Sequence, residues 1–410
     1  MNRPHVVIAA GGTGGHILPA IEVANALLER GHDRDEIIFI GSSRGQDANL
    51  FKSEGFAFTL LPGRGISRNL SVKSIVINLG ALYGLFVAVL RTSVMFVRRR
   101  PSVVVAVGGY ASFSSALAAV LFRVPLILVN TDAVPGLVNA IFSRFASASA
   151  VAFPGTQLAH ARVTGTPISR RIAELDRSPQ GQKQARELLG IPSDRRTIVA
   201  FGGSLGARRI NEAIVGLAAH WKGRDDISIY QVTGRRDYDE ILKQKTQANP
   251  SGISRLETVL ADRDGPERDG LDRDGPDRDS LDRDTNRGLI WHLAAYEDRM
   301  PTVYAAADLV VCRSGAMTVA ELAIAGVPAV LVPLPNAPRD HQRENAKALV
   351  EAGAAVLVSD DQCSADTLAK VIEPILNDEH ALESMGRAAK LLGHVDAAFL
   401  VAEMVDDYVC

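Results

Sequence analysis

A chain of 410 residues is longer than one typical hydrophobic core supports and fits two α/β domains. Hydrophobic residues make up 47% of the chain and charged residues 22%, which excludes bulk disorder and is typical of a soluble globular protein. The formal net charge of -2 excludes a general nucleic-acid-binding protein, so any basic surface must be local.

The cysteines and the N-terminus indicate a cytoplasmic protein. Cys312, Cys363 and Cys410 are odd in number and form no Cys-x-x-Cys pair, which argues against a disulfide framework or a zinc site. A single Arg precedes the first apolar run, and that run ends in glycines, so we expect no signal peptide.

The first predicted strand, Val6–Ala10, leads into the glycine run Gly11–Gly15, then His16 and a helix from about Pro19 to Arg30. This order predicts the start of a Rossmann-like domain. The glycines do not match Gly-x-Gly-x-x-Gly, and the next strand, 36–40, ends without an acidic residue, so a nicotinamide cofactor is disfavoured. No Gly-Lys-Ser/Thr follows, which excludes a P-loop.

His16 is the only titratable side chain in this glycine run. An unperturbed imidazole pKa near 6.5 suits a general base for a sugar hydroxyl. The alternative is that His16 only caps or packs the loop.

A basic and apolar stretch follows between residues 64 and 100, and it contains no Asp or Glu. Ser74–Leu90 is uncharged and rich in large apolar residues, but it is shorter than the ~20 residues of a membrane span and contains Asn78. We therefore expect a partly exposed helix of the domain, whose cations bind anionic lipid headgroups. The alternative is an ordinary core helix with solvated ends. The cations are Arg64, Arg68, Lys73, Arg91, Arg98, Arg99 and Arg100.

Two more strands complete the expected first domain, which spans residues 1–166. Val103–Val107 ends in a glycine pair followed by Tyr110, and Val124–Val129 is followed by Asp132, which could accept hydrogen bonds from a sugar. The second domain, 167–395, repeats the opening pattern with the strand Ile198–Phe201, a glycine run and a helix. Within that run, Ser204 adds a hydroxyl donor to the backbone N–H groups of an anion site.

Residues 262–287 repeat Asp-Arg-Asp triplets at a ten-residue period with almost no apolar content, which predicts a disordered surface insertion. We expect no metal role for these carboxylates because they follow no strand end. The last segment, 396–410, is apolar enough to form a helix that packs back on the first domain.

The strand Leu309–Cys312 is followed by a turn at Ser314-Gly315 and a helix that carries Glu321. A helix N-terminus binds diphosphate through its unpaired N–H groups, and Glu321 lies where it could accept from two ribose hydroxyls. The alternative is an ordinary turn with a solvated or ion-paired Glu. Farther on, Gln342 and Asn345 share one face of a helix that begins near Asp340.

Six motifs in this order resemble those of glycosyltransferase family 28, whose members complete the lipid-linked disaccharide of peptidoglycan. The motifs are Gly11–His16, Gly108–Ser112, Val134–Leu137 with Asn139, Phe201–Ala207, Cys312–Glu321 and Asp340–Ala346. The resemblance covers nearly the whole chain and implies a GT-B fold, no cofactor and no metal.

The resemblance further implies inverting transfer of N-acetylglucosamine from UDP-N-acetylglucosamine to the 4-hydroxyl of undecaprenyl-diphosphate-linked muramyl-pentapeptide. It implies peripheral attachment to the cytoplasmic face of the membrane and contacts with other cell-wall synthesis and division proteins. His16 would stand near the acceptor hydroxyl. The residues expected at the donor are Thr13, Gly14, Gly15, Asp132, Arg170, Ser204, Ala316, Met317, Thr318, Val319, Ala320, Glu321 and Gln342.

Three positions depart from the family pattern. Asp132 replaces an asparagine expected near the donor sugar, Arg170 stands one place late for a phosphate contact, and Phe113 follows Ser112 where the family has Gly-Pro. The rival hypotheses are a GT-B transferase with another lipid acceptor and a catalytically idle nucleotide-sugar-binding scaffold.

Overall fold

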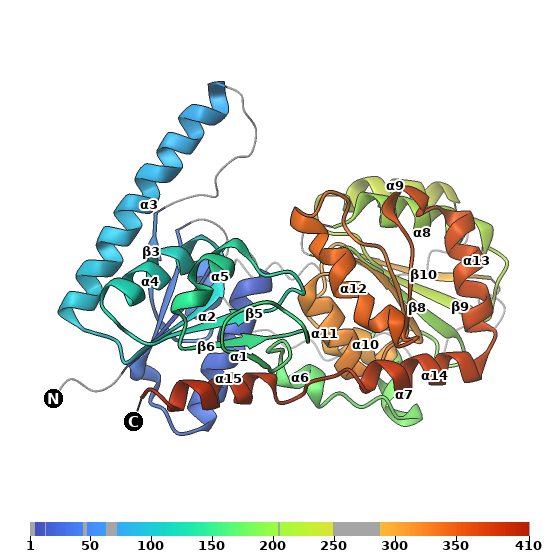
Figure 1. The fold of residues 1–410 in the computed structure, drawn as a ribbon. Coiled ribbons are helices and arrows are strands. Elements are labelled where there is room, and N and C mark those ends of the chain that lie inside the picture. Colours follow the sequence, from blue (N-terminus) through green and yellow to red (C-terminus); the bar gives the residue numbers. More distant parts are fainter. Residues whose placement is uncertain are drawn as a thin grey trace, which may run out of the picture.

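The computed structural model describes residues 5–12, 14–43, 47–62, 72–203, 206–248 and 288–409. Thr13, Arg64, Arg68, Ser204 and the Asp/Arg repeat lie outside the described residues, as does the side chain of Lys73. The described chain forms two parallel β-sheets with helices on both faces, so the predicted α/β class is confirmed (Figure 1).

The first sheet has seven strands in the order β3-β2-β1-β4-β5-β6-β7, all paired in parallel. Its central strands are apolar along their whole length because helices cover both faces of the sheet. The strands are β1 Val6–Ala10, β2 Ile37–Ser42, β3 Ala57–Leu61, β4 Val103–Gly108, β5 Leu126–Asn130, β6 Ala148–Val151 and β7 Ala161–Val163.

The second sheet has six parallel strands in the order β10-β9-β8-β11-β12-β13. The strands are β8 Arg196–Phe201, β9 Ile227–Val232, β10 Ile290–Ala294, β11 Leu309–Cys312, β12 Ala329–Leu331 and β13 Ala355–Leu357. Both sheets are doubly wound, with the chain reversing its direction of strand addition between β1 and β4 in one and between β8 and β11 in the other.

Helices connect the strands in both halves. In the first half they are α1 Gly14–Glu29, α2 Asp47–Ser53, α3 Val72–Arg98, α4 Tyr110–Leu121 and α5 Leu137–Phe142. In the second they are α6 Arg170–Ala173, α7 Pro179–Leu188, α8 Arg208–His220, α9 Tyr238–Ala248, α10 Met300–Ala306, α11 Ala316–Ala325, α12 His341–Glu351, α13 Ala365–Leu376 and α14 Glu379–Lys390. Short 3-10 turns occur at Arg34–Glu36, Ser143–Phe145, Pro338–Asp340 and Asp360–Gln362.

The last helix, α15 Ala397–Asp406, crosses from the second half and lies beneath the first (Figure 1). Its apolar side chains Val401 and Val405 are fully buried in the core that also contains α1. At its end, Asp406 accepts hydrogen bonds from Arg30 at 2.6 Å and pairs with His32 at 2.7 Å. The chain terminus is therefore fixed to the far end of α1.

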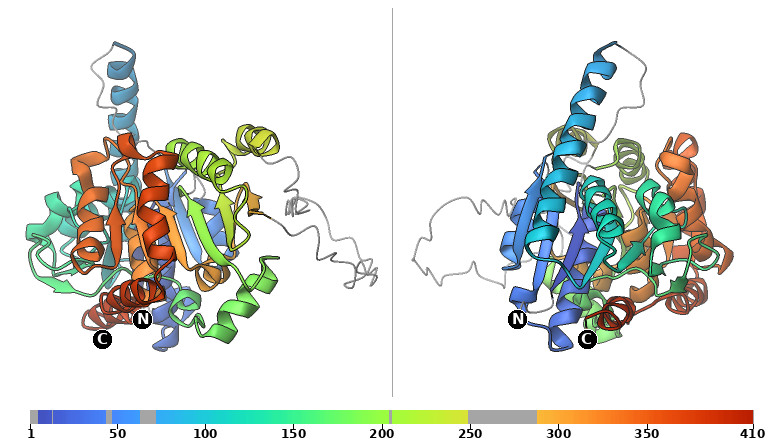
Figure 2. Two further views of the ribbon diagram at one scale, coloured as in Figure 1. Left: turned by 90° about the vertical axis from the view of Figure 1, so that its right-hand side faces the viewer. Right: turned by 60° about the vertical axis from the view of Figure 1, so that its left-hand side comes forward.

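Helix α3 is longer and more exposed than the sequence predicts. It projects beyond the first domain as a straight rod (Figures 1 and 2). Only one side of it packs on the domain, through Ala88, Thr92 and Phe96, which are at most 2% exposed. Within it, Asn78–Arg98 is 21 residues long and apolar enough to cross a membrane, and only 22% of that stretch is buried.

Candidate active site

The carboxyl ends of β1, β4, β8 and β11 carry the glycine-containing turns of the chain. In doubly wound sheets, ligands bind outside the carboxyl ends of the strands, at the point where the strand order reverses. Gly11-Gly12 follows β1 and Gly109 follows β4, while Gly202-Gly203 follows β8 and Gly315 follows β11. Nothing lies within 4 Å of the place where a Cβ would be on Gly12, Gly203 and Gly315, so a ligand can approach the backbone closely at these three glycines.

Helix α1 begins at Gly14, five residues before the predicted start, so Gly14 and Gly15 lie in its first turn. Gly12 has a φ of 94°, which a residue with a side chain rarely adopts. The turn also touches the end of β4, since a Cβ on Gly109 would lie 2.0 Å from the carbonyl oxygen of Gly11. These contacts fix the first glycine turn against its neighbouring strand.

His16 lies in the first turn of α1, and its ring packs against the end of β4. A Cβ on Gly108 would meet the imidazole at 2.5 Å. Burial lowers the pKa of His16 below its usual value, although a hydrogen bond to the backbone of Gly11 and the carboxylates of Asp132 and Asp47 act in the opposite direction. His16 is therefore neutral at pH 7 and able to accept a proton.

Asp132 and Asn345 join the two domains. The amide nitrogen of Asn345, in α12, donates to Asp132 Oδ1 at 2.9 Å and to the Ser314 carbonyl at 3.3 Å. Its amide oxygen accepts from the backbone N–H of Ala133 at 2.7 Å. Nearby, Arg339 donates to the Pro135 carbonyl at 3.1 Å. The loop after β5 and the start of α12 are thus held together across the domain boundary.

Helix α11 carries the residues predicted at the diphosphate and ribose. Gly315 caps it without a side-chain hydrogen bond, and nothing lies within 4 Å of the place where a Cβ would be, so its first turn is open to a ligand. Glu321 accepts a hydrogen bond from Tyr304 at 2.7 Å. Burial raises the pKa of Glu321 to about 7, while the Tyr304 hydroxyl acts to lower it.

Gln342 lies one turn before Asn345 on α12. Its side-chain oxygen accepts from the Leu334 N–H at 2.8 Å, and its carbonyl accepts from the Ser314 hydroxyl at 2.8 Å. Ser314 is fully buried. These hydrogen bonds hold the start of α12 against the turn before α11. Gln342 and the segment from Ala316 to Glu321 therefore lie close together at the candidate site.

The structure does not bring Arg170 to this edge. Its side chain is 62% exposed and pairs with Glu29 at 2.9 Å and with Glu174. Glu29 is the last residue of α1, so Arg170 lies about 22 Å of helix away from Gly14. Arg170, which stands one place late in the motif, thus forms an ion pair between α6 and α1.

Two residues of the site, Asp47 and Tyr304, were not predicted from the sequence, and Asn345 was predicted only to share a helical face with Gln342. Asp47 accepts the Gly12 N–H, Tyr304 holds Glu321, and Asn345 bridges the domains. The helical face that Asn345 shares with Gln342 indicated that Asn345 lies near the site. Its partners in the first domain, Asp132 and Ala133, could not be predicted because they lie more than 200 residues away in the sequence. For Asp47 and Tyr304 the chain offers no motif, because their contacts depend on how neighbouring strands meet.

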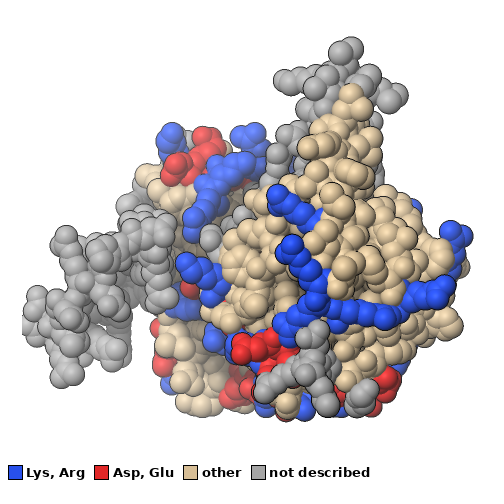
Figure 3. Space-filling view, turned by 90° about the vertical axis from the view of Figure 1, so that its left-hand side faces the viewer, with Lys and Arg blue, Asp and Glu red and all other residues tan. Residues whose placement is uncertain are grey.

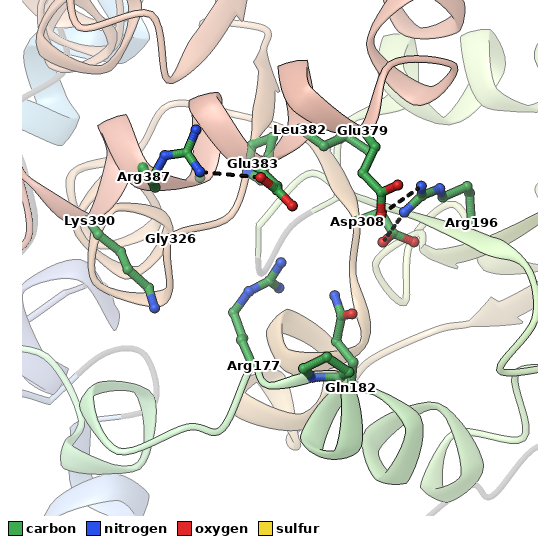
Figure 4. Close-up of a pocket in the computed structure, with 13 residues that line it drawn as sticks. Arg177, Gln182, Arg196, Asp308, Gly326, Glu379, Leu382, Glu383, Arg387 and Lys390 are labelled. Atoms are coloured by element: carbon green, nitrogen blue, oxygen red, sulfur yellow. Dashed lines mark hydrogen bonds and ion pairs between the residues drawn. The ribbon is translucent and has the colours of Figure 1, made fainter.

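A hollow of about 360 Å³ lies at the opposite, amino-terminal edge of the second sheet (Figure 4). Its carboxylates are already paired, with Asp308 and Glu379 facing Arg196 at 3.6 and 3.7 Å and Glu383 facing Arg387 at 3.2 Å. It is remote from the glycine turns and from Glu321, so we do not assign the nucleotide to it.

Two doubly wound domains bridged at their carboxyl edges, with an open helix N-terminus beside a carboxylate, define a GT-B glycosyltransferase. Two family models match the chain: the N-terminal domain of glycosyltransferase family 28 over residues 6–151 and its C-terminal domain over 275–401. The chain belongs to glycosyltransferase family 28, and the resemblance seen in its motifs is confirmed.

Curated relatives match almost end to end. A UDP-N-acetylglucosamine--N-acetylmuramyl-(pentapeptide) pyrophosphoryl-undecaprenol N-acetylglucosamine transferase of Desulforudis audaxviator is 34% identical over 98% of this chain and 97% of its own. The enzyme of the same description from Streptomyces coelicolor is also 34% identical, with the same shares covered. The crystal structure of Acinetobacter baumannii MurG superposes with a TM-score of 0.73 at 25% identity, covering 98% of this chain and 99% of that one.

Proposed function

We propose that this protein transfers N-acetylglucosamine from UDP-N-acetylglucosamine to the 4-hydroxyl of an undecaprenyl-diphosphate-linked muramyl-pentapeptide, with inversion and without a metal. The end-to-end likeness to transferases named for this reaction supports the proposal. The structural observation that carries it is the open N-terminus of α11 with Glu321 one turn and a half along the same helix.

The donor would lie between the two switch points. The first turn of α11 would bind the diphosphate together with Ser204, and Glu321 would accept from the ribose hydroxyls. Gln342 and Asp132 would contact the sugar, and Thr13 with the start of α1 would close over it. In this arrangement the helix dipole stabilises the negative charge that develops on the departing diphosphate.

His16 would act as the general base. The acceptor oxygen bonds to the anomeric carbon as the bond from that carbon to the UDP oxygen breaks, and the hydroxyl proton passes to the imidazole. Because burial lowers its pKa, His16 is unprotonated at neutral pH and can take that proton. Attack from the side opposite to UDP inverts the configuration.

The exposed side of α3 supports attachment to a membrane surface. Seven large apolar side chains lie on one face of the helix and are between 41% and 71% exposed: Leu79, Leu82, Tyr83, Phe86, Leu90, Val94 and Val97. Arg91, Arg98 and Arg100 are exposed beside or below this face, and Figure 3 shows Lys and Arg side chains along a largely uncharged surface. An apolar face rimmed by cations binds anionic lipid.

We infer a peripheral arrangement on the cytoplasmic face rather than a membrane span. The other side of α3 contains Ala88, Thr92 and Phe96, which are buried against the domain. A helix that crossed the bilayer would have to give up this packing, whereas a helix that only lies in the headgroup region keeps it. The anionic inner leaflet is also where the lipid-linked acceptor would be found.

The decisive test is turnover of UDP-N-acetylglucosamine by the purified full chain with a lipid-linked muramyl-pentapeptide. The expected products are UDP and the β-linked disaccharide lipid. Turnover only with a different lipid acceptor would support another GT-B transferase, and donor binding without turnover of any lipid would support a scaffold. No binding of UDP-N-acetylglucosamine would overturn the assignment of the site itself.

A further inference from the structure

Asp47 is a buried carboxylate beneath the first glycine turn. It follows β2 as the first residue of α2, and it is 0% exposed. Its Oδ2 accepts the Ser42 N–H at 2.7 Å, and its two oxygens lie 3.3 and 3.2 Å from the Gly12 nitrogen. One side chain therefore ties the end of β2 to the turn that follows β1.

The glycines around this carboxylate pack closely against it. A Cβ on Gly11 would lie 2.6 Å from Asp47 Oδ2, and a Cβ on Gly41 would lie 3.3 Å from the same atom. Distances this short show that the turn and the carboxylate are packed as one unit. Part of the glycine content of this run is thus explained by Asp47, before any ligand is considered.

A buried carboxylate is costly unless its hydrogen bonds are satisfied. Asp47 forms no ion pair with any residue that the structure describes, and backbone N–H groups are its described partners. A neutral amide could accept only with its single oxygen and would place an NH2 group against one of these donors. With an amide oxygen in the place of Oδ2, the NH2 group would take the place of Oδ1 and face the Gly12 N–H at 3.3 Å, so a carboxylate fits this position better than an amide.

The same turn controls His16. The backbone of Gly11 hydrogen-bonds to His16, and the carbonyl of Gly11 is in contact with the end of β4, against which the imidazole packs. The carboxylates that act on the ring are Asp47 from α2 and Asp132 from the loop after β5. Asp47 thus affects His16 in two ways: it holds the backbone of the turn to which His16 hydrogen-bonds, and its negative charge acts on the imidazole.

We propose that Asp47 is a positioning residue for the transfer reaction: it fixes the Gly11-Gly12 turn that holds His16, and its charge stabilises the imidazolium that forms when His16 takes the acceptor proton. This inference rests on the proposed role of His16 as the base.

The first test is Asp47→Asn in the full-length protein, with Asp47→Glu as the variant that keeps the charge. We expect Asp47→Asn to lower kcat by roughly 10- to 100-fold, because a base displaced by a fraction of an ångström loses its alignment. The acidic limb of its pH profile should move to lower pH, since a negative charge that raises the pKa of His16 has gone. Asp47→Glu should keep the limb of the wild-type protein.

The second test needs no turnover. The pKa of His16 is measured by NMR titration of its imidazole C2–H, with the signal assigned by its loss in His16→Ala. Asp47→Asn should lower this pKa and Asp47→Glu should not. This measurement separates the proposal from the proposed function, because an inactive wild-type protein would still report whether Asp47 acts on His16.

Asp308→Asn is the matched control. Asp308 is also buried, accepts the Thr197 N–H at 2.6 Å and pairs with Arg186 at 2.7 Å, but it lies at the opposite edge of the second sheet. The Asp308→Asn variant should have a lower unfolding temperature than the wild type, but the same pH profile of kcat and the same His16 pKa. If Asp47→Asn behaved in the same way as Asp308→Asn, Asp47 would have only a structural role and the proposal would be overturned.

Discussion

Burial and a hydrogen bond from Tyr304 act on the pKa of Glu321 in opposite directions, and burial dominates. With its pKa raised from 4.5 to about 7, Glu321 stabilises the folded state when it is protonated, below about pH 4.5, and this contribution is lost as the pH rises through 7. The loss amounts to ~3 kcal/mol.

We therefore expect Glu321→Gln to remove that pH dependence. The unfolding temperature of the variant should exceed that of the wild type at pH 8 by more than it does at pH 5, and thermal unfolding at both values measures this. The same variant should raise the donor KM, because an amide accepts fewer hydrogen bonds from a ribose than a carboxylate does. An unchanged donor KM would remove Glu321 from the site.

The second residue-scale prediction concerns His16. His16→Ala should lower kcat by roughly 10²- to 10⁴-fold with little change in donor KM, because the base acts only in the transition state. In the wild type the acidic limb of the profile should fall below pH 6.5, since burial lowers the pKa of His16. A loss of less than threefold would leave His16 with a packing role.

Residues that follow strand ends were predictable from the sequence, and residues that support them were not. His16, Asp132 and Glu321 lie six, two and nine positions after the end of an apolar strand, and this local order is present in the structure. The contacts of Asp47 and Tyr304 span 35 and 17 positions and depend on the strand order of each sheet. A single sequence does not contain that strand order as a local pattern.

At the scale of elements, each strand that the sequence predicts lies within two residues of its observed bounds, but other strands, among them β6 and β10, were not predicted, and helix ends were less well placed. The sequence predicts that the apolar helix ends at Leu90, because Arg91 is the next charged residue. In the structure Arg91 is exposed, whereas Thr92 and Phe96 are buried, and the helix continues to Arg98. Helix α1 begins five residues before Pro19, although Pro19 then lies inside the helix and cannot donate a hydrogen bond to the Gly15 carbonyl. In both helices the packing, rather than the residue type, sets the boundary.

Helix α3 also carries an element-scale prediction. The protein should sediment with anionic vesicles at low salt and dissociate at high salt, because exposed cations bind headgroups through screened interactions. Replacing Leu82 and Phe86, which are 52% and 66% exposed, by Asp should weaken binding at least tenfold per side chain.

Leu391→Asp is the matched control for this experiment, since Leu391 is an 86% exposed leucine after α14, remote from α3. Its vesicle binding should equal that of the wild type. If the protein left the vesicles only in detergent and not at high salt, the stretch Asn78–Arg98 would instead be inserted across the bilayer.

At the scale of the whole molecule, Asn345 is a buried group through which the two domains contact each other next to the site. It is fully buried and hydrogen-bonds with Asp132 and the backbone of Ala133 across the boundary. The loop that precedes α12 is strained, with positive φ at Asn336, Arg339 and Asp340. Such strain persists only where surrounding contacts offset it, and one contact of this loop is the hydrogen bond from Arg339 to the Pro135 carbonyl at 3.1 Å.

We expect Asn345→Ala to open the domains in the absence of donor, which small-angle X-ray scattering would record as an increased radius of gyration. Asp132→Ala should have a smaller effect, because it leaves the Ala133 contact in place. The matched control is Arg170→Ala, which removes an ion pair between α6 and α1 that is exposed to solvent and therefore contributes little to stability.

The two substitutions should also be non-additive, because Asn345 and Asp132 share one hydrogen bond of 2.9 Å. A double-mutant cycle on unfolding or on donor affinity should give a coupling of roughly 0.5–3 kcal/mol. Additive effects together with an unchanged radius of gyration would show that domain closure depends on other contacts. The covalent return of α15 to the first domain, fixed by Asp406, would then be the leading alternative.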